Sequence, residues 1–492
     1  MTVSCKSAIG LLVAVLCHFI AGLSHAGEAA PNVIVILADD LGWNDVGFHG
    51  SEIKTPHLDR LAAGGVRLDR FYVQPACSPT RSELMSGVSA ISLGVLSPFS
   101  KLQPAGLPIS RRLLPQYFQN AGYQTLMVGK WHLGFRQSQF HPNARGFDHF
   151  YGHVTGGIGY WDHVHGGGLD WQRNGATLRE DGYSTHLLRD EAIRMIEARD
   201  ADKPVFLYLA FNAPHLPGEA PEYALSPYAG LVDHDRRLHA GMVSEMDAAI
   251  GALLLTLEKH DLADNTLIWF MSDNGGLNPS AFPPAAVSVM STLDSWFEER
   301  ELPLRALEFA RVNVLRGAAD NAPLRGGKQN VYEGGIRVPA LVSWPGVLEP
   351  GVHSDMVTVL DALPTLLSAA NLPAATDIDG RDQWPALTSG VRLPATGYHV
   401  TGLDGEAIVQ FPWKLVARDP DTPELYRLDE DPREQRNLAT EHPDRLQELL
   451  QAMAATPRGE PLNLPVWRVV GDPDFFGGEE DRPPWSELQK HD

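Results

Sequence analysis

The amino-acid sequence predicts an α/β protein in which helices cover both faces of a mostly parallel central sheet. Two observations lead to this prediction. Short apolar runs of strand length, which suit a parallel sheet buried on both faces, recur at 33–37, 125–128, 205–210 and 266–271. Between them lie stretches with the apolar spacing of helices, such as 113–121 and 242–257.

Each of these predicted strands is followed at once by polar or charged side chains. In chain order these are Asp39 and Asp40, Lys130 and His132, Asn212 and His215, and Asp273 and Asn274. Ligands of such sheets bind beyond the carboxyl ends of the strands. We therefore expect these distant segments to meet at one edge of the sheet.

Beyond residue 394 the pattern changes to a small antiparallel sheet with a closing helix. Short strand-like pieces occur at 399–401, 407–411, 415–417 and 424–428, and a helical pattern occurs near 443–455. The predicted organisation is an export signal at 1–26, a main domain at 27–394, a small C-terminal α+β subdomain at 395–470, and a tail at 471–492. The tail is rich in proline, glycine and acidic residues, and we expect it to be loosely ordered.

The first 26 residues have the features of an export signal. Lys6 precedes an apolar run at 8–23, and 24–26 form a small-x-small cleavage pattern. The run is shorter than the roughly 20 apolar residues of a membrane span, no later segment qualifies, and Leu16 is too large to precede a lipid-bearing Cys17. We expect an exported protein, periplasmic or secreted, with no membrane attachment after cleavage.

The formal net charge of −21 limits the partners of this protein. At long range it repels nucleic acid and sulfated polymers alike. We therefore expect no nucleic-acid partner, and any anionic substrate requires a local basic cluster.

Cys77 is the only cysteine that remains once the export signal is set aside. Exported proteins commonly pair their cysteines, so a single thiol indicates an intermolecular bond, a reactive role or a chemical conversion. A small buried hydrophobe is the alternative. Pro79 suits the first turn of a helix and Ser78 suits its cap. A helix that begins there places residue 77 beside free backbone N–H groups, which favour anions.

The run Cys77-Ser78-Pro79-Thr80-Arg81 resembles the core motif of the sulfatases, in which a maturation enzyme oxidises the cysteine to formylglycine. Further motifs extend the resemblance along nearly the whole chain after the signal, at 37–50, 55–59, 128–134, 212–215, 272–276 and 323–328. The chain is most similar to the arylsulfatase B, or N-acetylgalactosamine-4-sulfatase, type. The resemblance implies an alkaline-phosphatase-like sandwich with a small C-terminal antiparallel sheet subdomain, and it makes 27–394 the catalytic domain.

Asp39, Asp40, Asp273 and Asn274 are hard oxygen donors, which suit calcium or magnesium better than zinc. Such pairs also occur as turn formers and solvated loop ends, so the residues alone leave both interpretations open. The resemblance implies a metal site with Ca²⁺ as the ion, held by these four residues and by the converted Cys77.

The resemblance also implies six catalytic residues, namely Cys77, Arg81, Lys130, His132, His215 and Lys328. A formylglycine hydrates to a diol, and a nearby divalent cation favours the ionised form that attacks sulfur. Arg81 and Lys130 would hold this diol, and His132 would be the base that releases sulfate. His215 and Lys328 would bind the sulfate oxygens and help to protonate the leaving oxygen. A single lysine is most often a solvated charge, so the joint pattern carries the prediction.

These features predict a calcium-dependent sulfatase that hydrolyses sulfate esters. Its substrate would be a sulfated carbohydrate or an aryl sulfate, and its partner during maturation a formylglycine-generating enzyme. Phosphodiester and phosphonate monoester hydrolases share the fold, and some share the formylglycine, so they are an alternative. A non-enzymatic glycan-binding protein is a further alternative, but it predicts a missing ligand or nucleophile, and every expected position is filled.

A second group of histidines lies in a glycine-rich stretch with several aromatic residues: His153, His163 and His165, with Tyr160, Trp161 and Trp171. Three interpretations stay open. The group is a metal site, a loop whose aromatic faces contact sugar rings, or an exposed structural loop.

Two segments depart from the usual sulfatase pattern. Residues 84–90 lack the Leu-Thr-Gly-Arg continuation, which leaves open how efficiently Cys77 is converted and whether a substrate contact is lost. A long insert at 277–322, with helix-like spacing at 292–314, replaces a short loop of arylsulfatase B relatives. We expect this insert to border the substrate pocket, so the linkage preferred by those relatives does not transfer.

Overall fold

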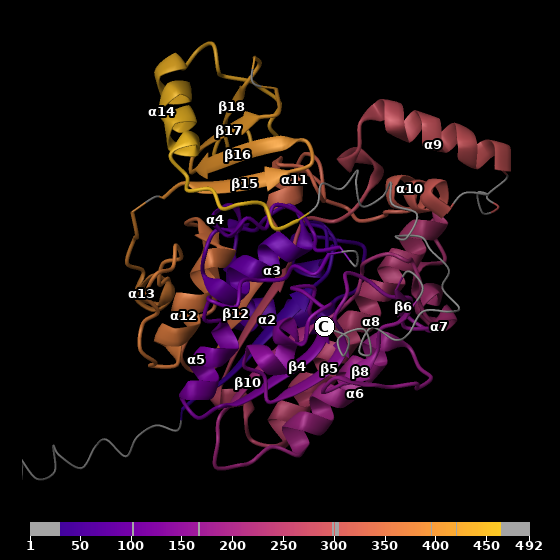
Figure 1. The fold of residues 1–492 in the computed structure, drawn as a ribbon, viewed down its shortest axis with the longest axis vertical. Helices are drawn as coiled ribbons and strands as arrows, with labels where there is room; N and C mark the ends of the chain where they lie inside the picture. The colour runs from indigo at the N-terminus through magenta and orange to yellow at the C-terminus, as the bar shows by residue number, and fades with distance from the viewer. Residues whose placement is uncertain are drawn as a thin grey trace, which may run out of the picture.

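The computed structural model describes residues 30–100, 103–165, 168–297, 300, 305–394, 396–419 and 421–463. The predicted export signal at 1–26 and the predicted tail at 471–492 lie outside the described residues. The described chain forms a large sheet between layers of helices, with a smaller sheet above it in the view of Figure 1.

Ten described strands form the central sheet. In spatial order they are β13 (Gly351–His353), β2 (Val66–Leu68), β12 (Ala340–Ser343), β11 (Thr266–Ser272), β1 (Asn32–Ala38), β10 (Val205–Ala210), β4 (Gln124–Lys130), β5 (His149–His153), β8 (Gln172–Arg173) and β9 (Ala176–Thr177). The central strands from β11 to β5 run parallel, whereas β12 and β8 pair antiparallel with their neighbours β11 and β5. The predicted mostly parallel sheet is confirmed, and so are the four predicted strands.

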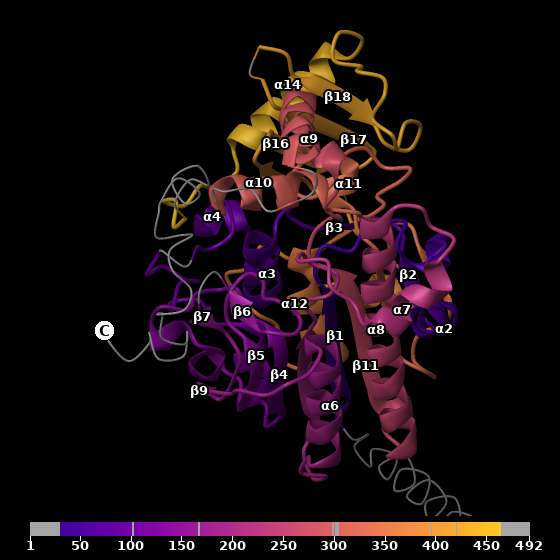
Figure 2. The same ribbon diagram turned by 90° about the vertical axis from the view of Figure 1, so that its right-hand side faces the viewer.

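An apolar core covers each face of the sheet. Side chains of a strand point alternately to its two sides, so each strand contributes to both cores. In β1, Val33 and Val35 belong to one apolar core, and Ile34 and Ile36 belong to the other. The first core includes residues of α3 (Cys77–Ser86), α5 (Leu114–Asn120) and α12 (Ala362–Ala369). The second includes residues of α2 (Pro56–Gly64), α6 (Ser184–Glu197) and α8 (His234–Lys259). Figure 2 shows α6 and α8 side by side in front of the sheet.

α8 contradicts the expectation that no segment after the signal qualifies as a membrane span. Among the described helices, α8 is the one that is long and apolar enough to cross a membrane by length and composition. However, 72% of its apolar window is buried inside the protein. It packs against α6 and contributes Met246, Ile250 and Leu253 to the second core. Its apolar side chains are those of a core helix.

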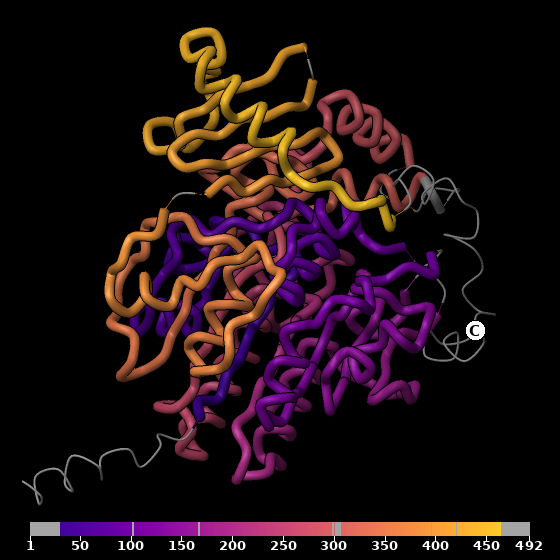
Figure 3. The backbone as a smooth tube through the Cα atoms, turned by 60° about the vertical axis from the view of Figure 1, so that its left-hand side comes forward, coloured from indigo at the N-terminus to yellow at the C-terminus, as the bar shows by residue number. Residues whose placement is uncertain are grey.

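The C-terminal sheet consists of β15 (Tyr398–Gly402), β16 (Gly405–Gln410), β17 (Trp413–Ala417) and β18 (Glu424–Arg427), all antiparallel. α14 (Pro443–Ala454) packs Leu449 and Met453 on one face, and the other face packs on Tyr332 and Ile336. Figure 3 shows this unit in orange and yellow above the indigo and purple N-terminal half. The predicted small antiparallel sheet with its helix is confirmed, while the domain boundaries stay a prediction.

The described part of the insert at 277–322 contains two α-helices, α9 (Pro284–Phe297) and α10 (Arg305–Leu315), and not one helical segment at 292–314. The sequence between them includes Pro303, which is incompatible with a helix interior. The two helices lie against each other, at the upper right of Figure 1. Asp294 of α9 forms ion pairs with Arg311 at 2.8 Å and with Arg316 at 3.1 Å.

Candidate active site

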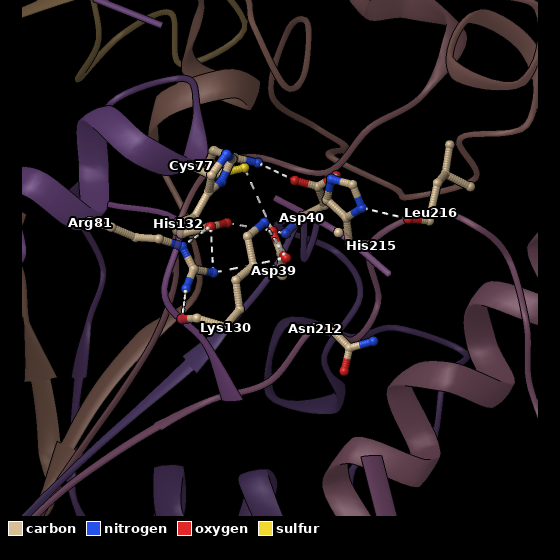
Figure 4. A network of polar contacts seen from close by, with 12 residues as sticks. Asp39, Asp40, Cys77, Arg81, Lys130, His132, Asn212, His215 and Leu216 are labelled. Atoms are coloured by element: carbon tan, nitrogen blue, oxygen red, sulfur yellow. Dashed lines mark hydrogen bonds and ion pairs between the residues drawn. The ribbon is translucent and has the colours of Figure 1, made fainter. Parts of the chain in front are cut away.

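The carboxyl ends of four neighbouring parallel strands lie level with one another, and this fixes the position of the site. Ala38 of β1 pairs with Ser272 of β11, Leu37 with Ala210 of β10, and Ala210 with Gly129 of β4. The segments that follow therefore start at the same edge of the sheet. In Figure 4, Asp39, Asp40, Lys130 and His215 lie close together, as the sequence predicts, whereas Asn212 lies apart and its amide bonds Ser184.

Gly129 allows β4 to place Lys130 in this cluster. Its φ is 113°, and a Cβ at this position would lie 1.8 Å from the carbonyl oxygen of Ala210, so glycine is required. Lys130 Nζ donates to Asp39 Oδ2 at 2.6 Å, and both side chains are fully buried. The ammonium is therefore paired with a carboxylate instead of being solvated.

The chain turns sharply at Asp40, whose φ of 67° lies in the left-handed region that aspartate tolerates better than most residues. Its carboxylate accepts hydrogen bonds from Lys328 Nζ and Asn274 Nδ2, each at 2.7 Å, and His215 Nε2 lies 3.7 Å away. Burial raises the pKa of Asp40, but Lys328 and His215 outweigh it and hold this pKa well below its ordinary value.

Cys77 is the first residue of α3, a helix whose ten residues are all buried. Its Sγ lies 3.7 Å from Asp39 Oδ1. Burial raises the pKa of the thiol to about 12, although Lys130 and Lys328 act in the opposite direction. An unmodified thiol at this position is therefore protonated at neutral pH.

The start of this helix differs from the prediction. α3 begins at Cys77, two residues before Pro79, and its cap is Ala76, with no side-chain cap hydrogen bond. Ser78 lies inside the helix, where its Oγ donates to the carbonyl oxygen of His132 at 2.8 Å. Ser78 thus holds the loop of His132 against α3 and does not cap the helix.

Arg81 lies one turn after Cys77 and is fully buried. Its Nε and Nη2 contact Asp273 Oδ2 at 3.0 Å and 2.8 Å, and its Nη1 donates to the carbonyl oxygen of Lys130 at 2.8 Å. Burial lowers the pKa of Arg81, but the surrounding Tyr208, Asp273 and Asp39 raise it above its ordinary value. The planar guanidinium is thereby fixed in one orientation beside residue 77.

His132 is buried, with a φ of 58°. Its Nε2 lies 3.1 Å from the carbonyl oxygen of Phe99, whereas its Nδ1 has no hydrogen-bond partner. Burial, helped by Lys130 and Arg81, lowers its pKa well below the ordinary value, so the ring is neutral at neutral pH. Because a carbonyl can only accept, the proton lies on Nε2 and Nδ1 is left as an acceptor.

His215 is the most exposed member of the cluster, with 20% of its side chain accessible. Its Nδ1 donates to the carbonyl oxygen of Leu216 at 2.6 Å, and its Nε2 is directed toward Asp40. Burial lowers the pKa of His215 to about 3, and Lys328 adds to this effect. The ring is neutral and lies at the mouth of the site.

The donor atoms present fit a divalent cation. One set of ligand atoms lies within 4.8 Å of one another, and these atoms belong to Asp39, Asp40, Cys77 and His215. The buried Asn274 Oδ1 has no partner, and Asp273 Oδ1 accepts only a 3.3 Å hydrogen bond from the N–H of Asp40. Carboxylate and amide oxygens suit a hard cation. The structure thus brings together the five predicted metal-site residues and adds His215.

The second histidine group does not form a comparable site. Within the described ranges, the set around Asp39 is the only group of metal-ligand side chains close enough to hold an ion. His163 stacks on the buried Trp171 at 4.5 Å, and His165 Nδ1 bonds the carbonyl oxygen of Gly157. Of the three aromatic residues in this stretch, Trp161 alone is exposed. The metal interpretation is not supported, and one ring remains for contact with a sugar.

Tyr160 has a role that sequence reasoning missed. It is fully buried, and its hydroxyl oxygen lies 2.9 Å from the carbonyl oxygens of both Asn212 and His215, between which its single O–H is shared. It therefore supports the loop that carries His215. The contact spans more than fifty residues, and no local pattern in the sequence indicates it.

A pocket of about 310 Å³ opens beside the cluster at Asp40. Pro214 and Leu216, on either side of His215, form part of its wall. The insert contributes Val312 and Arg316 among other residues, and residues of the first turns of α8 also line the pocket. The insert thus borders a pocket beside the site, as expected from the sequence.

The sequence model of the family described as Sulfatase matches residues 31–372, which include all of these side chains. The chain belongs to the sulfatase family. A second family model, described as N-sulphoglucosamine sulphohydrolase, C-terminal, matches residues 327–456. Sulfatases are sulfuric ester hydrolases, so the predicted enzyme class is confirmed at the level of the family.

Arylsulfatase J of Mus musculus is 35% identical over 429 residues, which cover 80% of this chain and 65% of that protein. N-acetylgalactosamine-6-sulfatase of Homo sapiens is 32% identical over 395 residues, which cover 75% and 68%. The chain therefore spans about two thirds of the length of these relatives. The predicted likeness to the 4-sulfatase type is not confirmed by these sulfatases of other types.

Solved structures are similar along most of the chain. The crystal structure of Ps i-CgsB in complex with k-i-k-neocarrahexaose has a TM-score of 0.78 at 29% identity and covers 91% of this chain and 98% of that one. PsFucS1 sulfatase from Pseudoalteromonas sp. has a TM-score of 0.66 at 23% identity, covering 93% and 97%. The second likeness concerns the fold alone. Both agree with the predicted sulfatase sandwich.

Proposed function

We propose that this protein is a calcium-dependent sulfatase that hydrolyses sulfate esters of glycans through a formylglycine made from Cys77. One observation supports this proposal above all others. A single buried cluster at the sheet edge combines Cys77, four oxygen-donor residues and three cations, contributed by distant parts of the chain.

The three cations of this cluster are fixed in positions where they can contact a bound anion. Arg81, Lys130 and Lys328 are all buried, and each contacts a carboxylate within 2.8 Å. Donors fixed in a water-poor site stabilise negative charge that develops in a transition state, because they need no reorganisation during the reaction. Removal of one such donor typically costs about 10²–10³-fold in kcat. The three cations face three carboxylates, so a bound Ca²⁺ would supply the local positive charge that the net charge of −21 makes necessary.

Asp39, Asp40, Asp273 and Asn274 would hold the Ca²⁺, which supplies electrostatic stabilisation of the developing negative charge. The formylglycine at position 77 supplies a nucleophile for sulfur. The chain's own residues orient it: Arg81 lies one helical turn away, and Cys77 is 3.7 Å from the carboxylate that Lys130 contacts.

Two histidines divide the proton transfers. Nδ1 of His132 is a buried acceptor without a partner, which suits a base that removes a proton from residue 77. His215 lies at the open side of the cluster, and its loop is supported by Tyr160. It is placed, with Lys328, to bind the sulfate oxygens and to help protonate the leaving oxygen. Because the proton of the neutral His215 ring lies on Nδ1, the Lys328 ammonium is the member of this pair that holds a proton for that step.

A sulfated glycan is the proposed substrate class because Ps i-CgsB, which is similar to this chain, was solved with an oligosaccharide bound. A formylglycine-generating enzyme is the proposed partner during maturation. The pattern at 1–26 supports export to the periplasm or the exterior. N-terminal sequencing of the protein from the extracellular or periplasmic fraction tests this, with a mature N-terminus at residue 27 as the expected result.

Turnover of an aryl sulfate and of a matched aryl phosphodiester tests the proposed reaction. The protein is coexpressed with a formylglycine-generating enzyme, and conversion of Cys77 is measured by mass spectrometry. Sulfate release by the converted protein, absent in Cys77→Ala, is expected. Efficient phosphodiester cleavage without sulfate release would contradict the proposal and favour the phosphodiesterase alternative.

A further inference from the structure

The pocket beside the cluster adjoins the place where an ester would be cleaved. It begins at Asp40, and Pro214 and Leu216 form its wall on either side of His215. With the sulfate held by His215 and Lys328, the alcohol part of the ester extends into this space. Its volume of about 310 Å³ lies in the range of pockets that hold small molecules. The pocket therefore accommodates the group that carries the sulfate.

The positive charge on the wall of this pocket is already neutralised. Among the described lining residues, Arg316 is the only lysine or arginine. Its Nη1 lies 3.3 Å from Asp235 and its Nη2 lies 3.1 Å from Asp294, so one guanidinium faces two carboxylates. His239, which also lines the pocket, is engaged at 2.8 Å with Asp45. A second anionic group on the substrate would meet these carboxylates and would find no unpaired lysine or arginine among the described lining residues.

The remaining wall is largely aliphatic. Leu238 and Met242 of α8 face the pocket with Leu277 and Val312 of the insert. A neutral sugar ring presents C–H groups on its faces and hydroxyls along its edge, so it matches a lining that combines aliphatic side chains with the polar Asp235. Mostly apolar walls with a few placed polar groups are typical of small-molecule sites.

We propose that this pocket, built jointly by α8 and the insert, selects a sulfated sugar unit that carries no second anionic group. The inference rests on the proposed sulfatase function and adds the chemistry of the preferred substrate. Asp235 and the Asp294–Arg316 pair determine the selection, and Val312 limits the space.

Sulfate release from monosulfated and disulfated forms of one disaccharide tests the selection, with an aryl sulfate as a small reference substrate. We expect kcat/KM at least about tenfold higher for the monosulfated form. Asp235→Asn should narrow this ratio at least about fivefold, because Arg316 then faces one carboxylate fewer. Asp190→Asn, which removes an exposed arginine-paired carboxylate outside the pocket, is the matched control and should leave the ratio unchanged. Equal or better turnover of the disulfated form by the wild type would overturn the proposal.

Binding measured without turnover separates this inference from the sulfatase reaction. The unsulfated disaccharide is titrated into Cys77→Ala protein by calorimetry, with and without Val312→Trp, which fills the pocket. We expect at least about tenfold weaker binding with Val312→Trp, and equal binding would overturn the pocket assignment. If this difference holds while no sulfate ester is turned over, the proposed reaction fails and the sugar pocket stands.

Discussion

The active-site cluster and a second cluster around Lys414 are both built from buried carboxylates and cations, but their surroundings differ. In the second cluster, Lys414 of β17 lies 3.0 Å from Glu333 and 2.8 Å from Glu434, and Tyr72 donates to Glu333 at 2.9 Å. Glu434 also accepts the backbone N–H of Glu333 at 2.8 Å. These contacts join β17, α11 (Glu333–Ile336) and the loop before α14.

The active-site cluster contains buried polar atoms with no polar contact, whereas Glu434 Oε1 of the second cluster, which has no hydrogen bond, is still paired with Lys414 Nζ at 2.8 Å. His132 Nδ1 and Asn274 Oδ1 are buried without partners, and a pocket opens at Asp40. Burying such groups without partners costs free energy, so their presence at the sheet edge indicates readiness for a ligand. Variants of the first cluster should therefore cost activity, and variants of the second should cost stability.

The largest expected effect is on activity. His215→Ala should lower kcat/KM for an aryl sulfate by about 10²–10⁴-fold, the usual contribution of a positioned proton donor or acceptor. The melting temperature should change little, because the ring is 20% exposed and lies at the mouth of the site. His260→Ala is the matched control, since its ring is 29% exposed at the end of α8, away from the cluster. A comparable activity loss in both variants would contradict the assignment.

In the second cluster the effect should fall on stability. Lys414→Met leaves Glu434 buried without a cation and Glu333 with only Arg337, 3.9 Å away, which should lower the free energy of unfolding by about 3–5 kcal/mol. Urea denaturation measures this change, while kcat of the folded protein should stay within about tenfold. Lys259→Met, at a pair whose lysine is 69% exposed, should cost less than about 1 kcal/mol. Equal costs for the two variants would refute the comparison.

Ca²⁺ should stabilise the folded protein by binding to the active-site cluster and not to the second cluster around Lys414. At about a hundredfold excess over its Kd, Ca²⁺ should raise the free energy of unfolding by about 2.7 kcal/mol, because it binds the folded state. Thermal denaturation with CaCl₂ and with EDTA measures this increment. Asp40→Asn should abolish it, whereas Lys414→Met, although less stable, should retain it. A persistent increment in Asp40→Asn would place the ion elsewhere.

The sequence predicts the active-site cluster much better than the second one. Apolar runs that end at Asp39, Lys130, Asn212 and Asp273 indicate a parallel sheet, and level strand ends bring their following residues together. The positions 333, 414 and 434, in contrast, follow no common pattern, because their contacts arise only when the two sheets pack. Long-range packing makes such clusters invisible to local reasoning.

The same limit explains the errors at individual elements. Pro79 and Ser78 indicate a helix start correctly to within two residues, but the hydrogen bond from Ser78 to His132 depends on a loop far along the chain. The composition of α8 passes the test for a membrane span because a core helix and a spanning helix have similar residues. The pocket of the insert requires the positions of α8 and α10 relative to the cluster, which spacing alone does not provide.

Glu83 connects the active-site cluster with the C-terminal sheet that contains Lys414. It lies on α3, the helix of Cys77, and contacts this sheet. Its carboxylate accepts hydrogen bonds from Tyr398 at 2.6 Å, and from Gln74 and the N–H of Ala90, both at 2.8 Å. Burial raises the pKa of Glu83 from its ordinary 4.5 to about 8, although these donors act against it. The folded state therefore holds this proton more tightly than the unfolded state.

The raised pKa of Glu83 predicts that the free energy of unfolding depends on pH. Measuring this dependence tests whether Glu83, like the second cluster around Lys414, contributes to stability. The contribution of Glu83 to the free energy of unfolding is fully present below about pH 4.5 and is lost as the pH rises to about 8. Over this range the free energy of unfolding falls by at most about 1.4 kcal/mol per pH unit. Glu83→Gln should flatten the dependence of the unfolding free energy between pH 5.5 and 8.5, as measured by urea denaturation. Glu197→Gln, at an exposed ion pair, should not. If the pH dependence of the unfolding free energy is unchanged in Glu83→Gln, Glu83 is ionised in the folded protein. The contact between α3 and the C-terminal sheet would then depend on the charge of Glu83.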